Sequence, residues 1–112
     1  MDAPYFNVDV AEEPGGWTIR FAGEVDYAAS LDLISKLEQV TERCETDLLL
    51  DLSKVTLLDS EGIKMLMKVW GRMREKSQHA RIVSCSKAAE RVLRLVGADD
   101  LLGMANGIIH GA

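Results

Sequence analysis

The sequence DLSKVTLLDSEGI, residues 51–63, predicts a strand that leads directly into a helix. The strand begins slightly earlier, because leucines at 48, 49, 50 and 52 form a nearly continuous apolar run. Such a run is typical of a strand that is covered on both faces or lies centrally in a sheet. Over Glu61–Lys76, apolar residues recur at the helical spacing i, i+3, i+4, i+7, at Ile63, Leu66, Met67 and Trp70. We therefore expect a central parallel strand and a helix that starts near Asp59 and Ser60.

The residues before this unit predict a β-hairpin and a first helix. Apolar and polar residues alternate over 6–10 and again over 17–21, and Pro14-Gly15-Gly16 separates the two runs. Asp26, at the end of Gly23-Glu24-Val25-Asp26, is a plausible N-cap. A helical stripe follows it at Leu33, Leu37, Val40 and Cys44.

The residues after the unit repeat the strand–helix alternation. Ala80–Cys85 predicts a short strand, and Ser86 is a good N-cap for a helix that ends at Gly97. The apolar stripe of that helix is expected at Val92, Leu93 and Val96. The tail predicts a short helix over Asp99–Ala105 and an extended piece over Gly107–Ile109.

Together these elements predict an α/β fold. An N-terminal hairpin followed by strand–helix units gives a mixed sheet of four to five strands with helices packed against it. A chain of 112 residues with 47% hydrophobic content fits one domain with one core. We expect a single domain over residues 1–112, with its core at about 6–102.

The composition argues against several kinds of partner. The net charge of −5 disfavours nucleic acid, because such binders neutralise phosphates with Lys and Arg. No apolar stretch is long enough to cross a bilayer, and Met1–Pro4 lacks the features of a signal peptide, so we expect a cytoplasmic protein without membrane contact. The cysteines and histidines of the chain do not have the spacing of a metal site; they are Cys44, Cys85, His79 and His110. We therefore expect reduced, structural thiols and no metal.

Ser60 lies where the first amides of the predicted helix lack partners. The simplest interpretation is that Ser60 or Asp59 is an N-cap, whose side-chain oxygen accepts one of those N–H groups. A helix N-terminus also tolerates a phosphate, because its amides and its partial positive charge favour an anion. Both interpretations are open from the residues alone.

Three segments of the chain resemble the STAS domains of bacterial anti-sigma-factor antagonists. Gly23-Glu24-Val25-Asp26 is similar to the family's Gly-Glu-(Leu/Ile/Val)-Asp motif, which lies between the second strand and the first helix. The segment 51–63 resembles the signature around the phosphorylated hydroxyl, and residues 89–97 with Leu101 resemble the last amphipathic helix. The resemblance runs from about Phe6 to Leu102, in the family's order.

The resemblance implies a switch and no catalytic activity. In the family, the hydroxyl directly after the signature Asp is phosphorylated by an anti-sigma factor that is also a serine kinase. This role carries over onto Ser60, and Asp59 matches the acidic residue that accompanies it. The unmodified form would bind the kinase and free the sigma factor, and a serine phosphatase would restore that form. No cofactor is implied, since ATP and magnesium belong to the kinase. Glu61 stands where the family often has Ser, Thr or Ala.

The helix after Ser60 also supplies a candidate contact surface. Met65, Val69 and Met73 form a second apolar stripe, with Met65 expected to be its most exposed member, and a basic row lies beside it. The same pattern fits a broad core face with a solvated charged edge. The partner-binding residues expected from the resemblance and from this surface are Asp26, Asp59, Ser60, Glu61, Gly62, Lys64, Met65, Lys68, Val69 and Arg72.

Two other functions remain as alternatives. The chain is alternatively a non-switching STAS subunit of a larger complex, such as a lipid-transport ATPase, in which Ser60 is only a cap. The second alternative is an enzyme, or a receiver-like phosphoacceptor that uses Asp51 or Asp59. This is disfavoured because the early acidic residues that magnesium-dependent aspartyl phosphorylation needs are missing.

Overall fold

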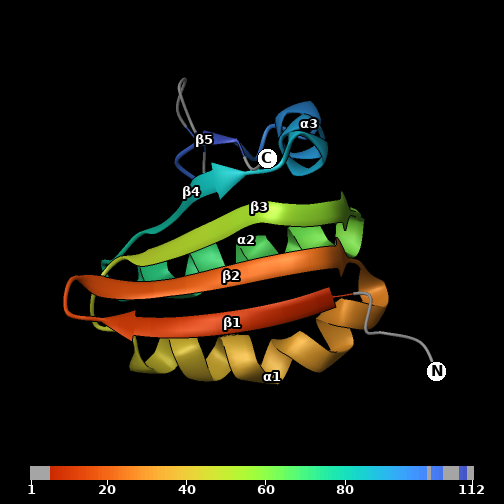
Figure 1. Cartoon of the computed structure of the whole chain (residues 1–112). Coiled ribbons are helices and arrows are strands. Elements are labelled where there is room, and N and C mark those ends of the chain that lie inside the picture. The colour runs from red at the N-terminus through yellow and green to blue at the C-terminus, as the bar shows by residue number, and fades with distance from the viewer. Residues whose placement is uncertain (1–5, 101, 105–108, 111–112) are drawn as a thin grey trace.

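The computed structural model describes residues 6–100, 102–104 and 109–110. The chain forms a single α/β domain in which strands and helices alternate after an N-terminal hairpin (Figure 1). In chain order the elements are β1 (Phe6–Glu13), β2 (Gly16–Val25), α1 (Tyr27–Arg43), β3 (Leu48–Leu58), α2 (Ser60–Glu75), β4 (Ala80–Cys85), α3 (Lys87–Leu95) and β5 (Ile109–His110).

The sheet is mixed, and its strand order is β1-β2-β3-β4-β5. β1 and β2 form the expected antiparallel hairpin, whereas β3 pairs in parallel with β2 and with β4. The two-residue β5 pairs in parallel with the end of β4. The predicted fold class and the central, parallel position of β3 are confirmed.

One face of the sheet carries most of the core. In β3, Leu48, Leu50 and Leu52 are completely buried, while Leu49 and Asp51, which point to the other face, are only partly buried. α1 and α2 pack side by side against the buried face (Figure 1). The apolar run of β3 therefore reflects its central place in the sheet, and its second face is not fully covered.

The core face of α2 differs from the prediction. Met65 was expected to be exposed, but only 4% of its surface is accessible, and Val69 and Met73 are buried with it. The residues expected at the centre of the face, Ile63, Met67 and Trp70, are only partly buried, although Leu66 is fully buried as predicted. The prediction about Met65 was wrong because α2 packs against α1 as well as the sheet, so its buried face is broad and turned towards α1.

The C-terminal elements confirm the strand and the caps but not the whole stripe. β4 has the predicted bounds, and Ser86 Oγ accepts a hydrogen bond from Ala89 N at 3.1 Å. The buried residues of α3 are Ala89 and Leu93, whereas Val96, the C-cap of the helix, is 58% exposed. The described residues of the segment 99–104 form turns, not the expected helix. Ala105, Gly107 and Ile108 lie outside the described residues.

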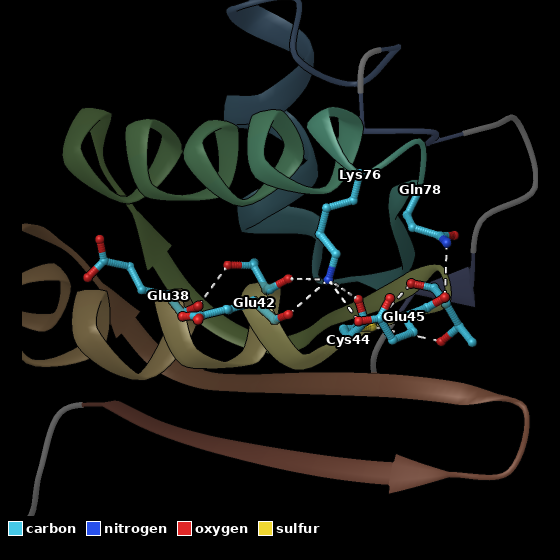
Figure 2. A network of polar contacts seen from close by, with 8 residues as sticks. Glu38, Glu42, Cys44, Glu45, Lys76 and Gln78 are labelled. Carbon is cyan, nitrogen blue, oxygen red and sulfur yellow. Dashed lines mark hydrogen bonds and ion pairs between the residues drawn. The ribbon is translucent and has the colours of Figure 1, made fainter.

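A single lysine joins the C-terminal ends of α1 and α2. Lys76 Nζ donates hydrogen bonds to the carbonyl oxygens of Thr41, Glu42 and Cys44, at 3.1, 3.0 and 2.5 Å (Figure 2). These carbonyls have no partner within the helix, and a cation there also interacts favourably with the helix dipole. The chain after α2 therefore caps α1.

Candidate functional site

α1 and α2 begin at the same edge of the sheet. Val25, the last residue of β2, lies opposite Leu58, the last residue of β3, in parallel register. Each strand is followed by an aspartate that caps the next helix: Asp26 accepts from Ala29 N at 3.0 Å, and Asp59 accepts from Gly62 N at 2.9 Å. The carboxyl ends of parallel strands are a common place for binding sites in α/β folds. The predicted cap at Asp26 is confirmed.

The Asp59 side chain serves both helices. Its Oδ1 accepts the Gly62 amide in α2, and its Oδ2 accepts the amide of Tyr27, the first residue of α1, at 3.2 Å. One carboxylate thus satisfies an amide at the start of each helix. This explains an acidic residue here without any catalytic role.

Ser60 is the first residue of α2 and is exposed. Asp59, not Ser60, is the N-cap. Within the residues that the structure describes, Ser60 Oγ makes no hydrogen bond. The Ser60 hydroxyl therefore does not cap the helix, and the residue is accessible from solvent.

Gly62 is required by the close approach of α2 to the end of β2. A β-carbon at this position would overlap the carbonyl oxygen of Val25 and lie 2.7 Å from Leu58 Cδ1. Gly62 is buried, so the interpretation as a partner-binding residue gives way to a structural explanation: it lets the start of α2 pack against β2 and β3.

The first exposed row of α2 begins at Ser60. Lys64, Lys68 and Arg72 follow it at intervals of four residues, which places them on neighbouring turns of one face. Lys64 pairs with Glu61 at 3.2 Å, and Arg72 pairs across to Glu38 of α1 at 2.8 Å. Lys68 is exposed and, among the described residues, has no carboxylate within ion-pair distance.

A shallow groove separates this row from α1. Its lining residues are Ile34, Leu37 and Glu38 from α1 and Met65, Lys68, Val69 and Arg72 from α2. The buried Met65 and Val69 therefore contribute to the groove between the helices and are not exposed contacts.

The part of this surface that α1 contributes was not predicted from the sequence. Tyr27, Leu31 and Ile34 are 58%, 61% and 37% exposed. They recur at i, i+4 and i+7, so they lie on one face of the helix, and Ile34 borders the groove. In the sequence, these three residues form a second apolar stripe that is offset from the core stripe at Leu33 and Leu37. This stripe could have indicated the contribution of α1 to the surface.

The described residues contain no group of three or more His, Cys, Asp or Glu side chains placed to hold a metal ion. Asp51 is engaged in the sheet, where its Oδ1 accepts from Ser53 N at 2.9 Å and its Oδ2 lies 3.7 Å from Arg20 Nε. None of the helices in this part of the chain is long and apolar enough to span a membrane.

Comparison with known families identifies the fold. The family model described as "Mlab, STAS domain" matches residues 8–103. The chain belongs to the STAS-domain family. The paired helix starts, Asp26 and Asp59, and the exposed Ser60 are therefore features of a STAS domain.

Three solved structures are similar to this STAS domain. An anti-sigma factor antagonist from Mycobacterium paratuberculosis superposes with a TM-score of 0.76 at 23% identity, covering 89% of this chain and 86% of that one. The antagonist SpoIIAA in its unphosphorylated form gives 0.63 at 18% identity, covering 89% and 100%. The STAS domain of an antagonist from Rhodobacter sphaeroides gives 0.56 at 18%, covering 70% and 85%. No curated relative matches at a significant level. At these identities the likeness establishes the fold.

Proposed function

We propose that this STAS domain is an anti-sigma-factor antagonist controlled by phosphorylation of Ser60. The unmodified form binds an anti-sigma factor with serine kinase activity and so frees the sigma factor. Phosphorylation ends that binding, and a serine phosphatase restores it. The protein acts in the cytoplasm, has no catalytic activity of its own and needs no cofactor.

The exposed Ser60 hydroxyl at the start of α2 is the observation that carries this proposal. Because Asp59 already caps the helix, Ser60 can be modified without loss of the cap. The fold similarity to anti-sigma factor antagonists supports the same assignment.

A phosphate at Ser60 would change binding through charge. Phosphoserine carries a charge of about −2, and Asp59 and Glu61 flank it with like charge. Against a partner, this charge must be desolvated or meet other acids. A penalty of about 3 kcal/mol weakens binding more than a hundredfold.

The test is phosphorylation of the purified protein with candidate anti-sigma kinases and ATP, followed by intact-protein mass spectrometry. We expect one added phosphate on the wild type and none on Ser60→Ala, with Ser53→Ala and Thr56→Ala as controls that remain substrates. Ser60→Asp is expected to weaken kinase binding, by less than phosphorylation does, since it carries one charge. Modification that persists in Ser60→Ala would place the switch elsewhere.

If the protein is instead a non-switching subunit of a larger complex, different results are expected. Glu61 adds a negative charge beside Ser60, where the family often has a small neutral residue, and this favours a chain that is not phosphorylated. In that case no kinase would modify Ser60, and the protein would co-purify stably with a transport ATPase. Ser60→Ala would then leave the complex unchanged.

A further inference from the structure

The exposed surface of α1 and the basic row of α2 form one continuous face. Tyr27, Leu31 and Ile34 provide an apolar ridge on α1. On α2, Lys68 lines the groove together with Ile34, and Lys64 lies one turn before Lys68. At the N-terminal ends of the two helices the face begins at Ser60, because Asp59 joins the starts of α1 and α2. At the far end the Arg72–Glu38 ion pair crosses the groove. We call this area the α1/α2 face.

Its charge and size indicate what would cover it. Lys68 has no carboxylate partner among the described residues, and Lys64 is 71% exposed and paired only with its neighbour Glu61. The apolar ridge runs from Tyr27 to Ile34, which is about 10 Å or two helical turns. A second copy of this face carries the same basic row, and its carboxylates Glu61 and Glu38 are already paired with Lys64 and Arg72, so it offers no free acidic group to Lys68.

We propose that the α1/α2 face binds a short amphipathic helix of the partner, about two turns long, whose apolar side chains cover the ridge and whose Asp or Glu residues pair with Lys64 and Lys68. The proposal rests on the proposed function and adds to it the contribution of α1 and the chemistry of the partner. We choose an acidic occupant because its carboxylates would complement the positive charges of Lys64 and Lys68.

Ser60 and Lys64 are four residues apart on α2, so a phosphate on Ser60 lies within reach of the Lys64 ammonium group. The phosphate then competes with Glu61 and with the partner's carboxylates for Lys64. Modification thus removes one of the two cations that the partner requires, in addition to placing a negative charge at the edge of the face.

The first experiment identifies and measures the occupant. A photo-crosslinking amino acid at position 31 in the source cells, with position 95 as a matched control, captures the partner for purification. Leu95 is 79% exposed and belongs to α3, which is not one of the two helices that form the face. The purified partner is then titrated with Leu31→Ser and Lys68→Glu, against Leu95→Ser and Lys36→Glu as controls. Lys36 is exposed and lies about 180° around α1 from Tyr27.

We expect the dissociation constant to rise at least about tenfold for Leu31→Ser and Lys68→Glu, and to stay within about twofold for the controls. Thermal melts of all four variants should stay near the wild type because each residue is exposed. A partner that binds Leu31→Ser and Lys68→Glu as tightly as the wild type overturns the proposal. So does equal capture from positions 31 and 95.

The two proposals fail separately. A kinase that phosphorylates Ser60 but is insensitive to both substitutions refutes the α1/α2 face and leaves the switch intact. A captured partner that shows the expected affinity pattern but does not phosphorylate Ser60 supports the face and refutes the kinase assignment.

The second experiment tests the role of Lys64 without a partner. Phosphoserine is installed genetically at position 60, and its second ionisation is followed by ³¹P NMR. A nearby ammonium group favours the dianion, so Lys64→Gln should raise the midpoint above that of the unsubstituted phosphoprotein, while Lys36→Gln should not. Equal midpoints in all three proteins would show that Lys64 does not pair with the phosphate.

Discussion

Asp59, the N-cap of α2, also accepts the amide of Tyr27, the first residue of α1, at 3.2 Å. The residue next to the proposed phosphorylation site therefore holds the starts of both helices that form the α1/α2 face. A substitution at Asp59 therefore removes a hydrogen-bond acceptor from the start of each helix.

Asp59→Ala should lower the free energy of unfolding by about 2 kcal/mol, because amides in two helices lose their acceptor. Asp26→Ala, which removes the cap of α1 alone, should cost about 1 kcal/mol. Urea unfolding of the two variants measures the difference. Equal losses would mean that the contact to Tyr27 contributes nothing to stability.

Gly62→Ala should destabilise the protein by about 1 to 3 kcal/mol, since the added methyl group overlaps the Val25 carbonyl oxygen and α2 must shift. Gly71 is the matched control in the same helix, because a β-carbon there meets nothing within 4 Å. Gly71→Ala should stabilise by about 0.5 to 1 kcal/mol. A neutral Gly62→Ala would contradict the tight packing at the helix start.

Lys76→Met should cost about 1 to 3 kcal/mol, because three carbonyls at the end of α1 lose a charged donor while the aliphatic chain is kept. Lys36→Met, on the exposed side of α1, should change stability by less than about 0.5 kcal/mol. Chemical denaturation distinguishes the two. Hydrogen exchange at the last turn of α1 should quicken in Lys76→Met alone.

Met65→Asp should unfold the protein as readily as Leu66→Asp does. Both side chains are buried, at 4% and 0% exposure, and an unpaired carboxylate in either place costs several kcal/mol. Lys64→Asp, the exposed neighbour, is the control and should stay folded by circular dichroism. A stable Met65→Asp protein would restore the original prediction that Met65 is exposed.

The stability of the protein should fall at alkaline pH in part through Cys85. Burial, with a smaller contribution from the Glu90 charge, raises the pKa of the Cys85 thiol from 9.0 to about 12. Below pH 9 the thiol is protonated in both states and has no effect. Between 9 and 12 the unfolded state loses this proton while the folded state keeps it, so the free energy of unfolding declines as pH rises. Urea unfolding from pH 8 to 10.5 should show a shallower decline in Cys85→Ala.

Sequence patterns predicted the strands, the caps and the place of Ser60, because these depend on local periodicity and on residue types with strong positional preferences. Asp26 and Ser86 cap their helices as expected, and β4 has the predicted bounds. The orientation of α2 was not predictable in the same way. Whether Met65 faces solvent depends on where α1 lies beside α2, and a wheel drawn for one helix contains no information about its neighbour.

The exposed stripe on α1 was missed for the same reason. Helical periodicity places Leu33 on the core stripe, where it is 3% exposed, but the sequence does not show whether Leu31, which is 61% exposed, faces solvent or a neighbouring element. Gly62 was assigned to binding because it lies in the signature segment, while its role in packing depends on the distance to Val25, a residue far away in sequence.

The fastening of α1 and α2 at both ends, by Asp59 at their starts and by Lys76 after α2, has a consequence for the thermodynamics of recognition. A surface whose two helices are already held in register loses little backbone entropy when it is covered. Association then needs fewer contacts to reach a useful affinity, and less of the binding free energy is spent on ordering the domain. A small change in surface charge accordingly accounts for a larger share of the total. A stiff pair of helices is thus well suited to a binding equilibrium that one phosphate group reverses.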